Sequence, residues 1–209
     1  MSKKPVIVFE GIEGSGKSTQ IELLESSLKD LGHDVKKLRE PGTTVLGERI
    51  REIFLEDTDE TIDPITEAFL LYASRKHLDQ NILRESLDKG CIVIADRYAD
   101  ATKAYQCFGK GLSIDFINYV HESSELLTPD LTFYMDISAE KSKDRISERE
   151  MDRMESEPLE FFEKVRQGYL KIAEKNPHRV VCLDANKSIE ELKTEIINKT
   201  LEKINASLE

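Results

Sequence analysis

The sequence predicts an α/β fold in which a five-stranded parallel sheet carries helices on both faces. Short apolar runs rich in β-branched residues alternate with stretches of helical spacing, and a glycine-rich loop joins the first run to the first helical stretch. The 209 residues suffice for one domain with a sizeable core, and they contain no repeat, linker or low-complexity stretch. We therefore expect a single domain over 1–209.

Five runs are expected to form the strands. Most are hydrophobic throughout, which is typical of strands buried on both faces. The second run is more polar and ends in a turn. The expected strands lie in 5–9, 34–42, 91–96, 131–137 and 179–184.

Helical spacing fills the gaps between these runs. In the first gap, Ile21, Leu24 and Leu28 recur at intervals of three and four residues, which places them on one helix face. The expected helices cover 17–31, 63–89, 114–126, 139–150, 159–174 and 188–206.

The glycine-rich loop has the sequence FEGIEGSGKST at 9–19. Gly11, Gly16, Lys17 and Ser18 fit the phosphate-binding pattern G-x-x-x-x-G-K-[ST]. Glycines let several N–H groups point at an anion, and the following helix N-terminus adds partial positive charge. The alternative is an ordinary glycine-rich turn, but the full pattern between a strand and a helix argues against it. We expect a three-layer P-loop nucleoside triphosphatase (NTPase) fold, with Lys17 on the β/γ-phosphates and Ser18 on Mg²⁺.

Charge and cysteine content limit the possible partners. The chain has 30 basic and 41 acidic residues and a net charge of -11, so neither a nucleic-acid surface nor an anionic-membrane surface is expected. The N-terminal apolar run is too short for a signal peptide or a membrane span. Cys91, Cys107 and Cys182 show no C-x-x-C spacing, and the two in apolar runs, Cys91 and Cys182, are expected to be core thiols in a reducing compartment. A cytoplasmic protein is therefore expected.

Polar residues follow the expected strands, where ligands of parallel sheets bind. Arg39 follows the second strand, and Asp96 and Arg97 close the third. Asp96 suits a Walker-B carboxylate that reaches a Mg²⁺-bound water, or else a helix N-cap. Arg97 suits bidentate phosphate binding, or else a local ion pair.

One arginine lies on a largely apolar stripe of the helix expected over 63–89. Leu71, Tyr72 and Arg75 share this stripe. Arg75 is either a snorkelling side chain or a planar group that reads a base.

Four segments occur in the order and spacing of bacterial thymidylate kinases, which the chain resembles. They are FEGIEGSGKST, REPGTT, LLYASR and DRYADATKAYQ, and the similarity extends to DRMESEPLEFFEKVRQGYLKIA. The resemblance implies a single P-loop kinase domain, a homodimer, and transfer of the γ-phosphoryl group of ATP to dTMP, which gives dTDP for dTTP synthesis.

The resemblance also implies roles for individual residues. Arg39, Arg51 and Arg97 match the set that binds the acceptor phosphate, with Asp96 near the metal. Arg75 would hydrogen-bond the thymine carbonyl. The other implied acceptor contacts are Glu13 at the 3′-hydroxyl, Thr102 and Gln106 at the base, Tyr105 at the deoxyribose and Leu71 in the base pocket. The implied ATP contacts are Gly11, Ile12, Glu13, Gly14, Ser15, Gly16, Lys17, Ser18 and Thr19.

A helical lid is expected at about 141–156. Gly14 stands where some family members carry an arginine, so positive charge over ATP would come from Arg145, Arg149 or Arg153. These three lid arginines, Lys17 and Arg97 are the expected catalytic cations. The alternative is a solvated helix, because acidic residues alternate with these arginines.

Three features differ from the family pattern. Leu71 stands where a phenylalanine usually stacks on thymine, which leaves open whether Leu71 or Tyr72 lines the base. Ala101 replaces a common serine, and CFGKG at 107–111 replaces a more glycine-rich turn that ends in arginine. These differences concern base affinity and loop shape, not phosphoryl chemistry.

Two other functions compete with dTMP kinase. A kinase for another nucleotide or a deoxynucleoside would share the fold and the loop. A guanine-specific switch would need an N-K-x-D segment, and NKSI at 186–189 lacks the aspartate.

Overall fold

The computed structural model describes residues 4–56, 60–146 and 156–206. Its five strands form one parallel sheet in the order β2-β3-β1-β4-β5, which confirms the predicted sheet. The strands are β1 Val6–Glu10, β2 Val35–Arg39, β3 Ile92–Asp96, β4 Leu131–Asp136 and β5 Val180–Asp184.

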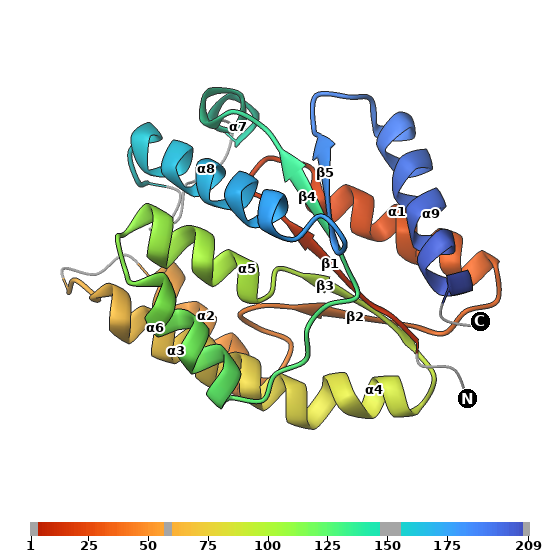
Figure 1. Cartoon of the computed structure of the whole chain (residues 1–209), viewed down its shortest axis with the longest axis horizontal. Helices are drawn as coiled ribbons and strands as arrows, with labels where there is room; N and C mark the ends of the chain where they lie inside the picture. Colours follow the sequence, from red (N-terminus) through yellow and green to blue (C-terminus); the bar gives the residue numbers. More distant parts are fainter. Residues whose placement is uncertain (1–3, 57–59, 147–155, 207–209) are drawn as a thin grey trace.

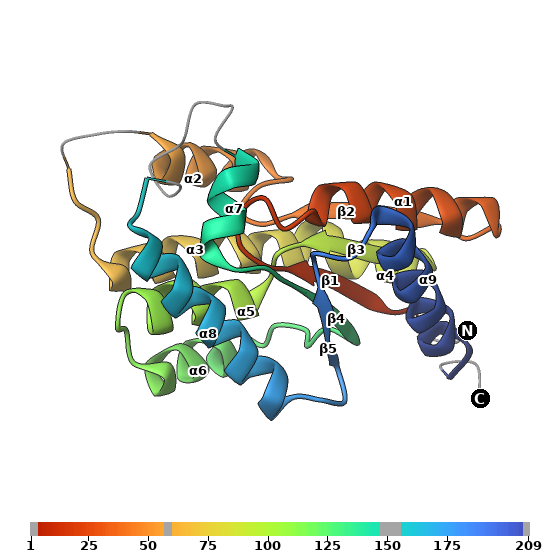
Figure 2. The ribbon, with the colours of Figure 1, turned by 90° about the horizontal axis from the view of Figure 1, so that it is seen from above.

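Helices cover both faces of the sheet. The helical elements are α1 Lys17–Asp30, α2 Val45–Leu55, α3 Pro64–Leu78, η1 Asp79–Leu83, α4 Arg84–Asp88, α5 Ala99–Thr102, η2 Lys103–Gly109, α6 Ile114–Ser123, α7 Ala139–Ile146, α8 Leu159–Lys175 and α9 Ile189–Ala206. Helices α1 and α9 pack together on one face, while α4, α5 and α8 lie on the other (Figure 1). Seen from above, α7 lies beside the loop that follows β1 (Figure 2).

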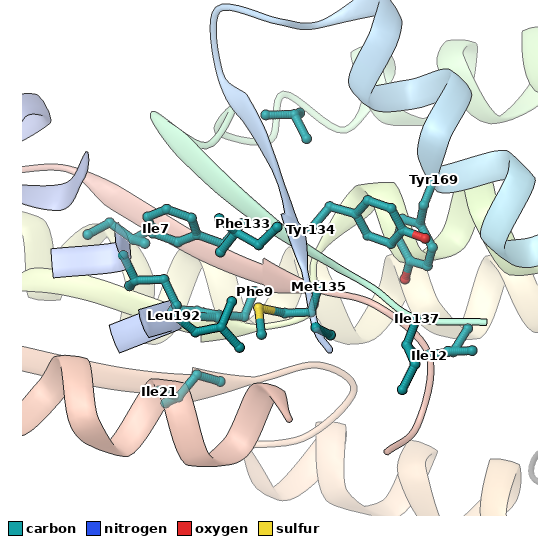
Figure 3. Packing of buried hydrophobic residues seen from close by; sticks show 14 of the residues in the cluster. Ile7, Phe9, Ile12, Ile21, Phe133, Tyr134, Met135, Ile137, Tyr169 and Leu192 are labelled. Atoms are coloured by element: carbon teal, nitrogen blue, oxygen red, sulfur yellow. The ribbon is translucent and has the colours of Figure 1, made fainter. Parts of the chain in front are cut away.

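The core follows the alternation of side chains along the strands. On β1, Ile7 and Phe9 pack with residues of α1 and α9, whereas Val6 and Val8 pack with Leu78 of α3 and the start of α5. Figure 3 shows Ile7 and Phe9 among the buried side chains of the first cluster. Because every β1 residue is buried, the ends of this strand are fixed from both faces.

Three helical segments differ from the predictions. Helix α2 was not predicted. It begins after Thr44, whose side chain accepts from the Gly47 N–H, and it buries Ile50 and Phe54. The helix expected over 63–89 contains a π-helical turn, η1, between α3 and α4. Residues 99–109, for which no helix was predicted, form α5 and a second π-helical segment, η2.

The burial expected for two cysteines is wrong. Cys182 is exposed and Cys91 is half-buried, while Cys107 is the buried one. Strand β5 lies at the edge of the sheet, so its alternate side chains face solvent. Within the described residues, no helix has both the length and the apolar character needed to cross a membrane.

Candidate active site

A cleft of about 530 Å³ opens at the carboxyl ends of the strands. It brings together every residue that the sequence assigned to the acceptor. These are Glu13, Arg39, Arg51, Leu71, Arg75, Asp96, Arg97, Thr102, Tyr105 and Gln106. Parallel-sheet topology places those that end or follow strands at one site, and helices α2, α3 and α5 with η2 bring the others to it.

The P-loop connects β1 to α1 along one side of the cleft. Gly14 and Gly16 have φ values of 69° and 90°, which glycine adopts without strain. The Lys17 Nζ lies 2.9 Å from each of the carbonyl oxygens of Gly11 and Ile12, to which it donates hydrogen bonds. Burial lowers the pKa of Lys17 to about 8, so an anion beside it would restore the charged form.

Six of the nine expected ATP contacts line the cleft. They are Glu13, Gly14, Gly16, Lys17, Ser18 and Thr19. The other three, Gly11, Ile12 and Ser15, are buried and are not part of its wall. A Cβ on Gly11 would lie 2.8 Å from the Met135 carbonyl oxygen, so the approach of the loop to β4 requires glycine there.

Helix α7, which contains the start of the expected lid, packs directly on the P-loop. A Cβ on Gly14 would lie 2.9 Å from the Ser142 carbonyl oxygen and 3.1 Å from Ile146. The Ser142 hydroxyl donates to the Glu13 carbonyl oxygen at 2.6 Å. A side chain at position 14 would therefore displace α7 from its place beside the P-loop.

Arg145 joins the P-loop to the loop after β5. Its Nη1 donates to the Gly14 carbonyl oxygen at 3.2 Å, and its Nη2 donates to the Ala185 carbonyl oxygen at 3.0 Å. Arg145 also lines the cleft. Among the three expected lid arginines, Arg149 and Arg153 lie outside the described residues.

Three arginines, Arg39, Arg51 and Arg97, line the cleft together. Arg97 has a φ of 68°, and its guanidinium donates to the Glu13 carboxylate and lies over the Tyr105 ring at 4.9 Å. Burial, and then the charges of Arg39 and Arg97, lower the pKa of Arg51. Clustered cations that disfavour one another indicate a site for a multiply charged anion.

Asp96 carries an unsatisfied oxygen. Its Oδ1 is buried without a hydrogen-bond partner in the described structure, and the residue lines the cleft with Ser18. This arrangement fits a carboxylate that faces a bound cation. Within the described ranges, no cluster of three or more acidic, histidine or cysteine side chains could hold a metal alone. Phosphate oxygens would therefore have to complete a Mg²⁺ site, as they commonly do.

Arg75 is fully buried, which excludes the snorkelling interpretation. Its Nε donates to Glu40 Oε2 at 2.6 Å, and its Nη2 donates to the Tyr98 carbonyl oxygen and the Thr102 hydroxyl, each at 3.1 Å. Its Nη1 has no hydrogen-bond partner among the described residues. Because Nε and Nη2 hold one edge of the guanidinium, Nη1 is the donor nitrogen that remains for a ligand in the cleft.

Leu71, not Tyr72, lines the cleft. Tyr72 is 4% exposed, and its ring packs edge-on against His121 of α6. The Arg75 guanidinium carbon also lies 4.8 Å from the ring centroid. The position at which the family usually has phenylalanine is therefore aliphatic here.

The CFGKG segment forms the end of η2 and the turn after it. Lys110 donates to Glu67 Oε1 at 2.7 Å, and Gln106 donates to Glu67 Oε2 at 3.2 Å. Glu67 is fully buried, so the pair with Lys110 compensates its charge and orients Gln106 toward the cleft.

Several lining residues were not among the predicted site residues. They are Glu40, Pro41, Phe54, Leu55, Tyr98, Ala101 and Ile146. Phe54 and Leu55 belong to α2, whose existence was not predicted. The spacing of Ile50 and Phe54 on one helix face, after the N-capping Thr44, is the signal that could have found this helix.

Comparisons with known proteins agree with one another. The family model described as thymidylate kinase matches residues 9–196. A thymidylate kinase of Sulfurihydrogenibium sp. (strain YO3AOP1) is 45% identical over 193 residues, which cover 92% of this chain and 94% of the relative. One of Chlorobium luteolum is 44% identical over 207 residues, which cover 94% and 96%. The crystal structure of a thymidylate kinase from Ehrlichia chaffeensis has a TM-score of 0.77 and 32% identity, and the match covers 94% of this chain and 98% of that one.

Proposed function

The chain belongs to the thymidylate kinase family and is a dTMP kinase, and we propose that its cleft residues carry the roles described below. The enzyme transfers the γ-phosphoryl group of ATP to dTMP and releases dTDP and ADP. An oxygen of the dTMP phosphate bonds to the γ-phosphorus while the bond to the β–γ bridging oxygen breaks, and ADP leaves with the electron pair. The observation that carries the proposed roles is the convergence of Arg39, Arg51 and Arg97 on one cavity with the P-loop.

The donor end of the cleft binds ATP. Main-chain N–H groups of 11–19 and the N-terminus of α1 surround the β- and γ-phosphates, and Lys17 neutralises them. Arg145, Arg149 and Arg153 act from the lid on charge that develops during transfer. Mg²⁺ would be held by Ser18 and Asp96, and when bound it neutralises charge on the β- and γ-phosphates.

The acceptor end binds dTMP. Arg39, Arg51 and Arg97 bind its phosphate, which suits their forked donors. Arg75 donates from its free Nη1 to a thymine carbonyl, next to Thr102 and Gln106. Glu13 and Tyr105 hold the deoxyribose, and Leu71 packs against the base. Catalysis then rests on positioning and charge neutralisation.

We propose that the protein is a cytoplasmic homodimer. Exposed apolar side chains gather on α2, α3 and α6, which pack side by side. Phe69 and Tyr119 are 54% and 70% exposed, and the Phe69 ring packs edge-on against Phe116. A second copy would cover this face, and light scattering after gel filtration should give twice the mass of the chain. A monomeric mass would contradict the dimer.

A coupled assay of ADP release tests the residue roles and the acceptor together. We expect dTMP to be the best acceptor among dTMP, dUMP, dCMP, AMP and thymidine.

Arg97→Ala should lower kcat by about 10²–10³, the scale of removing one preorganised donor. The matched control is Arg84→Ala, since Arg84 pairs with Asp79 outside the cleft. Near-normal turnover of Arg97→Ala would contradict its role, and a preference for AMP or thymidine would contradict the acceptor.

A further inference from the structure

A buried carboxyl group lies directly behind the wall of the cleft. Glu10 is the last residue of β1, is 1% exposed and is not part of the cleft lining. Its side chain reaches α5 and α8, on the sheet face opposite α1. The roles proposed above leave this group unused.

One oxygen of Glu10 holds the main chain that follows Arg97. Oε1 accepts from the Tyr98 N–H at 2.9 Å and from the Ala101 N–H at 3.2 Å. Tyr98 occupies the N-cap position of α5, but its own side chain makes no capping bond. The carboxyl group from β1 therefore accepts from the Tyr98 N–H just before the short helix, and it shares the Ala101 N–H with the Tyr98 carbonyl oxygen, which lies 3.2 Å from that nitrogen.

Arg97 needs such support because its backbone is in the left-handed region, with a φ of 68°. This conformation costs a non-glycine residue free energy unless its surroundings fix it. On the other side of the turn, the Arg97 N–H donates to the Phe9 carbonyl oxygen at 2.9 Å. The last two residues of β1 thus hold the main chain on both sides of Arg97.

The second oxygen of Glu10 reaches the Arg97 side chain through a tyrosine. Oε2 accepts from the Tyr169 hydroxyl at 2.9 Å, and that hydroxyl accepts from Arg97 Nη1 at 3.5 Å. The Tyr169 ring stacks on Tyr134 with centroids 4.9 Å apart, and Figure 3 shows the two rings together. The hydroxyl is therefore held in place between the carboxyl group and the guanidinium.

We propose that Glu10 is a positioning residue for phosphoryl transfer. Its carboxyl group fixes both the main chain and the guanidinium of Arg97. The inference rests on the proposed role of Arg97 at the acceptor phosphate. An arginine that stabilises developing charge must be held within a fraction of an ångström, because small misplacements cost large factors in rate. Glu10 acts on kcat through Arg97 and makes no contact with either substrate.

The conservative variant is glutamine. Burial, and then the charge of Asp100, raises the pKa of Glu10 to about 8, so a neutral amide suits the same surroundings. The amide oxygen of Glu10→Gln can accept from the same two N–H groups. Alanine removes all three hydrogen bonds.

A double-mutant cycle between Glu10 and Arg97 tests the proposal. We expect Glu10→Ala to lower kcat by about 10² and Glu10→Gln by less than about fivefold, with affinity for an unhydrolysable ATP analogue unchanged. In the Arg97→Ala background, Glu10→Ala should change kcat by less than about threefold, because residues that act as a unit are not additive. A merely structural role would give additive losses, and that result would overturn the proposal.

A second pair of variants covers the case in which Glu10→Ala does not fold. Tyr169→Phe removes only the hydroxyl bridge and should lower kcat by about three- to tenfold, an effect that disappears in the Arg97→Ala background. Tyr134→Phe is the matched control, since its hydroxyl donates to Asp136 instead. Equal effects of Tyr169→Phe in both backgrounds would overturn the proposal. A normal Arg97→Ala enzyme would instead contradict the proposed role of Arg97.

Discussion

The two ends of the cleft are built in different ways. The donor end, 13–19 with Arg145, consists largely of consecutive main-chain groups between β1 and α1, and α7 closes on it through carbonyl contacts. The base end, defined as Leu71, Arg75, Thr102 and Gln106, consists of side chains from α3, α5 and η2.

This difference decides where the sequence can change. At the donor end, Gly11 and Gly14 are fixed by steric contact with β4 and α7, so the motif leaves little freedom. At the base end, buried pairs such as Arg75 with Glu40 and Lys110 with Glu67 hold the recognition groups from behind. The three departures from the family pattern lie at or beside this end. A pocket supported by packing tolerates exchange of its lining better than a loop that must place its own backbone.

The largest expected effect concerns Lys17 at the donor end. Lys17→Ala should lower kcat by about 10²–10³, because it removes the positive charge that we propose acts on the β- and γ-phosphates. The ADP-release assay with saturating dTMP measures this loss. Lys29→Ala is the matched control on α1, since Lys29 is exposed and pairs with Glu25. Turnover near that of the control would show that the loop does not bind the transferred phosphoryl group.

The lid should give the next largest effect. Arg145→Ala should lower kcat by about tenfold or more and leave the KM for dTMP nearly unchanged, because it acts on charge that develops during transfer. Lys143→Ala, an exposed neighbour on α7, is the control. If kcat is unchanged with ATP saturating, Arg145 only holds α7 to the P-loop, and Arg149 and Arg153 are the residues to replace.

The base end should respond in affinity rather than in rate. Leu71→Phe should tighten dTMP binding by about tenfold, since base–aromatic stacking contributes about 1–3 kcal/mol. Calorimetry on the wild type, Leu71→Phe and Tyr72→Leu compares the two positions. Weaker binding by Leu71→Phe would show that the pocket has no room for a ring. A large loss of affinity for Tyr72→Leu, with the fold intact, would show that the Tyr72 ring contributes to dTMP binding.

The smallest expected effect is on the free energy of unfolding, through the buried carboxyl group of Glu10. The pKa of Glu10 is raised from 4.5 to about 8, so the native chain keeps a proton that the unfolded chain releases between these values. The free energy of unfolding should therefore fall as pH rises through this window. Across this window, the free energy of unfolding of the wild type should fall by about 1 kcal/mol or more relative to that of Glu10→Gln, which is the scale of one pKa unit. Urea denaturation of both proteins at about pH 5 and pH 8 measures this difference. Equal declines in the wild type and in Glu10→Gln would rule out Glu10 as the cause.

The sequence by itself determined the parts of this protein that depend on local order. The P-loop follows from Gly11, Gly16, Lys17 and Ser18, because main-chain conformation and helix N-terminus are set within nine consecutive residues. The strands follow from continuous apolar runs, and parallel topology then places every residue that follows a strand at one edge. For this reason the predicted residues that end or follow β1, β2 and β3 line one cleft. Arg51 of α2 and Leu71 and Arg75 of α3 join them only through the packing of these helices.

Tertiary packing decided the rest. Helix α3 turns Leu71 into the cleft and Tyr72 toward α6, a rotation that its apolar stripe did not specify. The π-helical segment η2 packs closely on α8, where a Cβ on Gly109 would lie 2.5 Å from Phe161.

The partners of Glu10 come from 98, 101 and 169, far from it in sequence. No local pattern encodes contacts between such distant segments, because they form only when the sheet brings β1, α5 and α8 together.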